Sequence, residues 1–200
     1  RAPVRVVPHP LLAADYENIA PAPRSAAFQA VALFDFNSSA ARKNPEGAVA
    51  AFRKAFGEDP ACELVIKTQN GSAHPEALAR LRRLAGPGVR IVDESWPYDE
   101  VKRLLAGADV LISLHRAEGF GLVMAEAMAL GTPVLATAYS GNLDFMDETT
   151  ALLAPSRPVA VDDPQGIYRG QTWAEPDIEA AAEGLRRLRN EPDLGPRLAT

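Results

Sequence analysis

The stretch DVLISLHRAEGFGLVMAEAMALGTPVLAT, residues 109–137, contains one full unit of the pattern that decides the fold. It begins with an apolar run, 109–114, that is typical of a buried strand. A turn with two glycines then leads into an apolar helix, and a second apolar run, 133–137, follows. A strand, a helix and a strand in close succession predict a parallel βαβ unit.

The same alternation extends along the chain. Further strands are expected at 29–36, 62–68, 89–93 and 151–155, and further helices at 44–57, 74–86, 97–108 and 176–190. Pro45 marks the start and Gly57 the end of the first of these helices. On the second, Leu78, Leu81 and Leu84 form an apolar stripe. We therefore predict an α/β fold, a parallel sheet sandwiched by helices.

Residues 1–27 differ from the rest, because they contain five prolines and cannot form a long helix. VRVV, at 4–7, is predicted to be one short strand, and the remainder a linker. This gives a linker with a first strand over 1–27 and a domain over 28–200. Since the chain lacks an initial methionine and ends soon after a predicted helix, we expect a longer native protein.

Composition excludes several classes of protein. Hydrophobic residues make up 47% and charged residues 24%, which predicts a packed globular core. The net charge of −5 argues against nucleic-acid binding through a basic surface. Cys62 is the only cysteine, so an internal disulfide framework is excluded and a reducing compartment is favoured. With three histidines and this one cysteine, no metal-ligand spacing occurs.

Ligands of parallel sheets bind where the strands end, so the loops 37–44, 68–74 and 114–121 are the candidate site. In the last loop, Gly119 and Gly121 flank Phe120 just before a helix. The free N–H groups of a helix N-terminus suit phosphate. The glycines alone are equally compatible with a tight turn that has no binding role.

Glu126 lies among apolar residues in the helix that follows. A helix that is apolar all round is usually buried, and a buried carboxylate needs partners such as ribose hydroxyls. A narrow exposed helix face would explain the same residue, so both interpretations stay open.

The loop after the first long strand offers the hydroxyls of Ser38 and Ser39 and the cations Arg42 and Lys43. Such groups suit contacts to a diphosphate, although a solvated basic loop with a serine cap is the alternative. His115 fits a packing role better than a catalytic one. The sequence contains no GxSxG elbow and no Walker pattern.

Three segments together resemble the C-terminal, nucleotide-sugar-binding domain of glycosyltransferase family 4, whose members are retaining enzymes of the GT-B fold. They are RKNPEGAVAAFRKAF (42–56), DVLISLHRAEGFGLVMAEAMALGTPVLATAYSGNLDFM (109–146) and ALLAP (151–155). Glu118 and Glu126, with seven residues between them, match the E-x7-E motif of that family. The resemblance covers about residues 4–189 and implies a Rossmann-like domain, one half of a GT-B fold, without its N-terminal acceptor domain.

The resemblance implies a role for each matching residue. Glu118 would bind the donor sugar, and Glu126 the ribose. Lys43 would neutralise the diphosphate leaving group, and the segment 93–100 would frame the base. The implied catalytic residues are Glu118 and Lys43. The implied donor-binding residues are Asn37, Ser38, Arg42, Lys43, Lys67, Trp96, Glu118, Gly119, Phe120, Gly121, Leu122 and Glu126.

The chain departs from the family at one place. Asn37 and Ser38 stand where many members have Gly-Arg, as in a bacterial subgroup, so diphosphate binding would depend on Lys43 with Arg42 and hydroxyl or amide donors. Enzymes of this family need no cofactor and no bound metal. The expected donor is a GDP-sugar, first GDP-mannose, or a UDP-sugar.

We therefore expect the donor-binding half of a retaining bacterial hexosyltransferase of polysaccharide biosynthesis. It would be cytoplasmic, with peripheral contact to the inner face of the membrane, and would serve a glycan or lipid-linked acceptor through the absent domain. Alone it would have little or no activity. A non-catalytic sugar-nucleotide-binding or interaction module is the alternative. A Rossmann oxidoreductase would require GxGxxG after the first long strand, and DFNSSAARKNP offers no such glycines.

Overall fold

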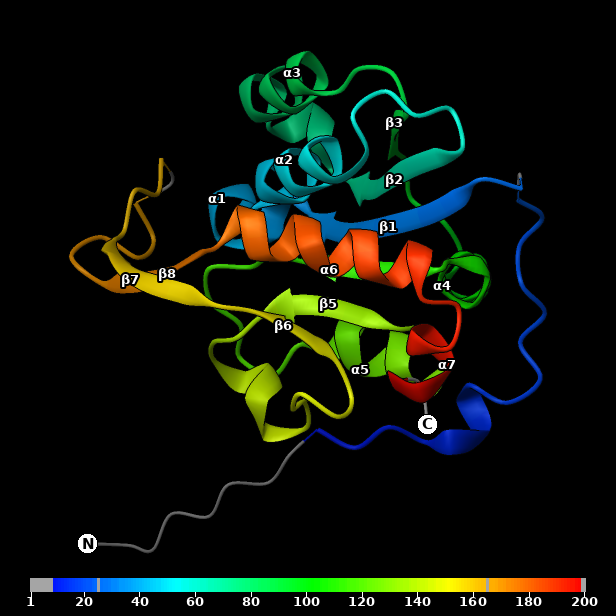
Figure 1. Ribbon diagram of the computed structural model, residues 1–200. Helices are drawn as coiled ribbons and strands as arrows, with labels where there is room; N and C mark the ends of the chain where they lie inside the picture. Colours follow the sequence, from blue (N-terminus) through cyan, green and yellow to red (C-terminus); the bar gives the residue numbers. More distant parts are fainter. Residues whose placement is uncertain (1–8, 25, 165, 199–200) are drawn as a thin grey trace, which may run out of the picture.

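A computed structural model of the chain describes residues 9–24, 26–164 and 166–198, so the strand predicted at 4–7 lies outside it. One sheet has six parallel strands in the order β3-β2-β1-β4-β5-β6 (Figure 1). They are β1 (Phe28–Asp35), β2 (Cys62–Gln69), β3 (Val89–Asp93), β4 (Val110–Ser113), β5 (Val134–Thr137) and β6 (Leu152–Ala154). The predicted parallel α/β fold is confirmed.

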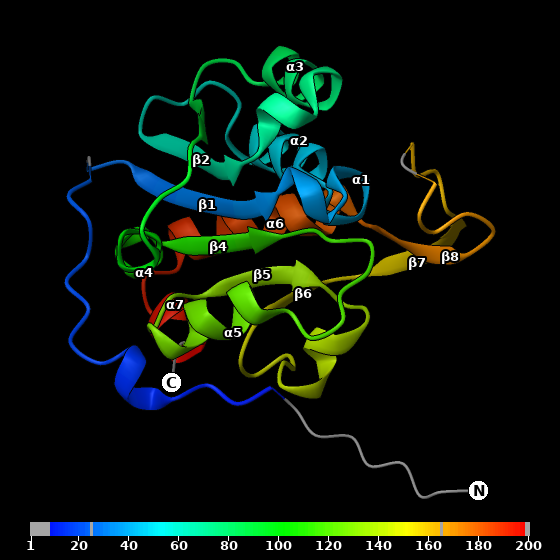
Figure 2. The same cartoon turned by 180° about the vertical axis from the view of Figure 1, so that it is seen from behind.

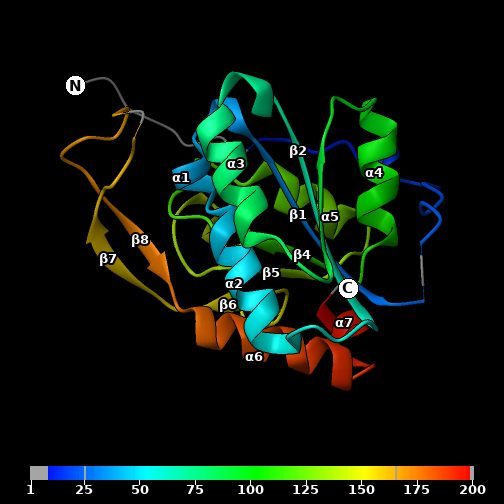
Figure 3. The same cartoon turned by 90° about the horizontal axis from the view of Figure 1, so that it is seen from above.

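Helices cover both faces of the sheet (Figures 2 and 3). One face packs against α2 (Pro45–Phe56), α3 (Pro75–Leu84), α6 (Ile178–Asn190) and α7 (Leu194–Leu198). The other packs against α4 (Tyr98–Gly107) and α5 (Leu122–Ala129). In β2, Leu64 and Ile66 enter the first core and Val65 the second, because successive strand side chains point to opposite faces.

The predicted start and end of α2 are confirmed, but one residue of the apolar stripe predicted for α3 is exposed. Pro45 starts α2, and Gly57, with φ of 61°, ends it. Leu78 and Leu81 of α3 are buried, but Leu84 is 41% exposed, so the predicted stripe is wrong at its last position. Each step of three residues advances about 300° around a helix. The two steps from Leu78 to Leu84 therefore leave Leu84 about 120° away from Leu78 around the helix axis.

A two-stranded antiparallel hairpin, absent from the sequence prediction, projects from the body (Figures 1 and 3). It consists of β7 (Ser156–Ala160) and β8 (Thr172–Pro176). The backbone N–H of Ala174 donates to the carbonyl of Arg116 at 2.9 Å, which fastens β8 to the loop after β4.

Short helical turns occupy several connections: η1 (Ala13–Asp15), η2 (Phe36–Ser38), α1 (Ala40–Lys43), η3 (Gly71–Ala73) and η4 (Gly141–Asp144). In the part of the chain that the structure covers, no helix combines the length and apolar character needed to cross a membrane.

The strand order reverses between β1 and β4, which are neighbours in the sheet although β2 and β3 separate them in the sequence. In open parallel sheets, such a switch point leaves a crevice beyond the carboxyl ends of the two strands. The loops that follow β1 and β4 therefore meet where a ligand is expected.

Candidate active site

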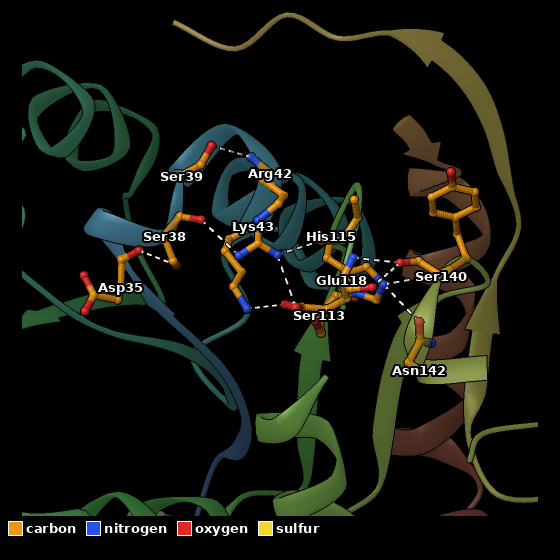
Figure 4. A network of polar contacts seen from close by, with 12 residues as sticks. Asp35, Ser38, Ser39, Arg42, Lys43, Ser113, His115, Glu118, Ser140 and Asn142 are labelled. Atoms are coloured by element: carbon orange, nitrogen blue, oxygen red, sulfur yellow. Dashed lines mark hydrogen bonds and ion pairs between the residues drawn. The ribbon is translucent and has the colours of Figure 1, made fainter. Parts of the chain in front are cut away.

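An ion-pair cluster joins these two loops (Figure 4). Lys43 Nζ contacts Glu118 Oε1, and Arg42 Nη1 lies 3.2 Å from Glu118 Oε2. The Glu118 side chain is only 9% exposed, against 21% for Lys43 and 14% for Arg42. The two residues predicted to be catalytic therefore lie in direct contact, and the cations are not a solvated basic loop.

The charge of Glu118 follows from this setting. Burial would raise the pKa of its carboxyl, but the positive charges of Lys43 and Arg42 outweigh burial and hold the pKa below its ordinary value. Glu118 is therefore a carboxylate at neutral pH, with both oxygens in contact with cations.

Arg42 also donates hydrogen bonds to the backbone of both loops. Its guanidinium donates to the carbonyls of Ala117 at 2.8 Å and Ser38 at 3.0 Å. Ser39, which has φ of 65°, caps α1 by accepting from the Arg42 N–H at 3.3 Å. The serine cap considered from the sequence is therefore present, and Arg42 holds the two loops together as well as contacting Glu118.

The turn after β5 fixes the backbone of Glu118, a role that was not predicted from the sequence. Ser140 Oγ accepts from the Glu118 N–H at 2.8 Å and donates to its carbonyl. At Gly141, a β-carbon would lie 2.1 Å from the carbonyl oxygen of Gly119, so no larger residue fits without displacing that loop. The Ser-Gly pair is a turn signal that could have pointed to this contact.

The N-terminus of α5 begins at Gly121, whose φ is 98°. No side chain caps it, and the N–H groups of Gly121 and Leu122 have no acceptor within the described ranges. Phe120 packs on Phe145 with ring centroids 4.9 Å apart, which orients the turn. The first turn of α5 therefore offers donors and a partial positive charge to an anion.

Glu126, on α5, is buried with 5% exposure, which excludes the solvent-facing interpretation. Its Oε1 accepts a hydrogen bond from Tyr98 at 2.5 Å and a longer one from Tyr16 at 3.5 Å. Neither tyrosine is among the residues predicted from the sequence. Glu118 and Glu126 contact different partners here, and the binding of one donor by both carboxylates stays a prediction.

Lys67 and Trp96 come together at a separate position. Lys67 is 5% exposed and donates to the carbonyls of Thr68 at 2.9 Å and Glu94 at 2.5 Å. Its ammonium lies 4.9 Å from the Trp96 ring centroid, and burial lowers its pKa. Neither Lys67 nor Trp96 contacts Glu118 or its cations. Lys67 instead holds the backbone of the segment predicted to frame the base, through its hydrogen bond to the Glu94 carbonyl.

Asn37 and Ser38 direct their side chains to neighbouring groups. The Asn37 Oδ1 lies 2.9 Å from His74 Nε2, and Ser38 Oγ donates to the Asp35 carbonyl at 2.7 Å. The Asp35 carboxylate accepts from Asn70 at 2.9 Å. These contacts join the loop 68–74 to the loop after β1, so all three predicted loops lie at one sheet edge.

His115 is fully buried and has a packing role, as predicted. Its Nε2 lies 3.0 Å from the Tyr139 carbonyl and 3.1 Å from Asn142 Oδ1, so this nitrogen carries the proton. Its Nδ1 lies 3.1 Å from both the carbonyl oxygen and the hydroxyl of Ser113, and in this tautomer it accepts from the hydroxyl. Burial lowers its pKa, so the ring is neutral at pH 7.

A cavity of about 790 Å³ lies on the other side of α1, between α1, the start of α3 and the hairpin. Neither Glu118 nor Glu126 lines it. Its wall includes Ser39, His74, Arg80, Arg116, Trp173 and Glu175. Within the described ranges, no group of three or more His, Cys, Asp or Glu side chains is placed to hold a metal ion.

The family described as glycosyl transferases group 1 matches residues 37–198. The D-inositol 3-phosphate glycosyltransferase of Kribbella flavida is 40% identical over 96 residues, which cover 47% of this chain and 22% of that protein. The matched residues thus span less than a quarter of the length of this relative.

Two solved structures resemble the fold. Anabaena Alr3699/HepE, crystallised with UDP and glucose, matches with a TM-score of 0.66 and 14% identity, over 87% of this chain and 42% of that one. The C-terminal domain of the group 1 family protein LpcC from Francisella tularensis matches with a TM-score of 0.64 and 15% identity. The match to LpcC covers 92% of both chains.

Proposed function

The chain belongs to the group 1 glycosyl transferases, and we propose from this premise that its sheet edge at β1 and β4 binds a nucleotide-diphosphate sugar. The contact between Lys43 and Glu118 at the switch point is the observation that carries the proposal. It sets a cation for a diphosphate beside a carboxylate for sugar hydroxyls, next to the uncapped N-terminus of α5.

In this proposal each group acts on one part of the donor. The N–H groups of Gly119 to Leu122 bind the phosphates, and Glu126 binds the ribose. Glu118 binds the sugar hydroxyls and stabilises positive charge that develops at the anomeric carbon. When the bond from that carbon to the diphosphate breaks, the electron pair stays on the diphosphate, where Lys43 stabilises the negative charge. The acceptor hydroxyl then bonds to the same face of the sugar, which retains the configuration, and its proton passes to an oxygen of the departing diphosphate.

The donor is a GDP-sugar or a UDP-sugar. The subgroup resemblance favours GDP-mannose, whereas the complex of HepE with UDP favours uridine. The acceptor, a glycan or a lipid-linked sugar, would bind to a second domain of a longer protein. That domain would also supply peripheral membrane contact, and the described chain alone would transfer little or no sugar.

Isothermal titration calorimetry of the 200-residue chain with UDP, GDP and ADP tests the donor site. We expect one nucleotide to bind at least tenfold more tightly than the others. Glu126→Ala should weaken its binding by about ten- to a hundredfold while leaving the cooperative unfolding transition intact. Unchanged affinity in this variant would favour a non-catalytic module that binds elsewhere.

A further inference from the structure

Two tyrosine hydroxyls meet at the carboxylate of Glu126. Tyr98 stands at the first position of α4, and Tyr16 directly follows η1, in the segment before β1. Their hydroxyl oxygens lie 3.0 Å apart, and both reach Glu126 Oε1, at 2.5 Å from Tyr98 and 3.5 Å from Tyr16. Segments that are far apart in the sequence therefore converge on the residue proposed to bind ribose.

The direction of these hydrogen bonds can be assigned. Burial and the bond to Glu126 raise the pKa of the Tyr98 hydroxyl, so it stays protonated and donates its one proton to the carboxylate. The one proton of the Tyr16 hydroxyl is then shared between the Tyr98 oxygen at 3.0 Å and Glu126 Oε1 at 3.5 Å. Glu126 Oε2 receives no hydrogen bond from the described part of the chain, which leaves that oxygen for a ligand.

The arrangement has the chemistry of a ribose diol. The 2′ and 3′ hydroxyls of ribose are also two neighbouring hydroxyl oxygens that can both donate to one carboxylate. Tyr98 makes the short bond, whereas the 3.5 Å contact from Tyr16 is at the limit of a hydrogen bond. Tyr16 is therefore the hydroxyl that a ligand displaces more easily.

The segment that carries Tyr16 is held on both sides of it. Lys102 Nζ donates to the Asp15 carbonyl at 3.1 Å, and the Ala22 N–H donates to the Arg103 carbonyl at 2.9 Å, so the segment lies along α4 (Figures 1 and 2). A rotation of the Tyr16 side chain alone would uncover Glu126 without detaching the backbone.

We propose, building on the donor-binding function proposed above, that the Tyr16 hydroxyl occupies the place of a ribose hydroxyl on Glu126 and that nucleotide binding displaces it. Tyr16 is thus a built-in competitor of the donor, supplied by the segment that leads into the domain. When the donor binds, the contact between Tyr16 of that segment and Glu126 of α5 is lost.

Calorimetry with UDP and GDP on the 200-residue chain tests this competition. Tyr16→Phe removes only the competing hydroxyl, so we expect the affinity for the bound nucleotide to rise about two- to tenfold. A gain of affinity cannot result from misfolding. The gain should vanish with the 2′,3′-dideoxy form of the same nucleotide, and in a Glu126→Gln background. Tyr168→Phe, in the loop of the hairpin, is the matched control and should bind like the unmodified chain.

The outcomes separate the two proposals. If Glu126→Gln weakens binding but Tyr16→Phe leaves it unchanged or lowers it, the competition by Tyr16 is wrong and the donor site stands. If Glu126→Gln leaves the affinity unchanged, or if neither the unmodified chain nor Tyr16→Phe binds UDP or GDP, the donor site itself is wrong and the competition falls with it.

Discussion

Lys43, at the end of α1, and Glu118, in the loop after β4, form an ion pair across the switch point of the sheet. The pair joins the two loops that follow neighbouring strands, and Arg42 reinforces it at 3.2 Å from the second carboxylate oxygen. Without a donor, Glu118 thus balances one of the two positive charges at this edge. A diphosphate would compete with Glu118 for Lys43 and leave the carboxylate free to accept from sugar hydroxyls.

Lys43→Met should weaken binding of UDP or GDP by about ten- to a hundredfold, because a charge-assisted hydrogen bond to phosphate contributes about 1.5–3 kcal/mol. Calorimetry measures the change. Lys54→Met is the control, since Lys54 pairs with the exposed Glu179 on the surface, and it should bind as the unmodified chain does. Equal affinities for the two variants would exclude Lys43 from the diphosphate site.

Glu118 should make stability depend on pH in acid. Because its pKa is lower in the folded chain than the ordinary value of about 4.3, the folded state holds the proton less tightly than the unfolded state. Its stabilising contribution is complete above that ordinary value and is lost as the pH falls through the lowered folded value. Urea unfolding from pH 7 to pH 3 should therefore show Glu118→Gln as the less stable chain at neutral pH, with a deficit that shrinks in acid. A deficit that stays constant across this range would contradict the assignment.

Gly141→Ala should destabilise the turn that holds Glu118. The new methyl would overlap the Gly119 carbonyl, and forced overpacking costs about 1–3 kcal/mol. Gly119→Ala is the matched control, because nothing lies within 4 Å of the position of its β-carbon. Urea unfolding should separate the two variants clearly, and equal free energies of unfolding would argue against the close approach of these loops.

The sheet could be predicted because its signals are local. Apolar runs and helix ends such as Pro45 and Gly57 lie within a few residues of the elements they define. The hairpin β7–β8 lacked such a signal. Pro158 lies within β7, and the residues of β7 are intermediate or exposed, so no apolar alternation marks that strand.

The site was predictable in part, for a similar reason. Glu118, Lys43 and Arg42 follow strands whose carboxyl ends must meet, so topology alone brings them close. The partners of Glu126 could not be found this way, because Tyr16 is 110 residues away in sequence and belongs to a segment with no regular pattern. For Lys67, the sequence could not show that the side chain donates to the backbone carbonyls of Thr68 and Glu94, and its contact with a donor stays a prediction.

The most direct test of donor binding at the switch point is a map of backbone amide NMR shifts as the isotope-labelled chain is titrated with UDP and then GDP. Donor binding at this edge predicts the largest shifts at Gly119, Gly121 and Leu122, with a second group from 93 to 100. The shifts should saturate at one nucleotide per chain. Largest shifts instead at His74 and Trp173, in the wall of the 790 Å³ cavity, or none with either nucleotide, would contradict the assignment.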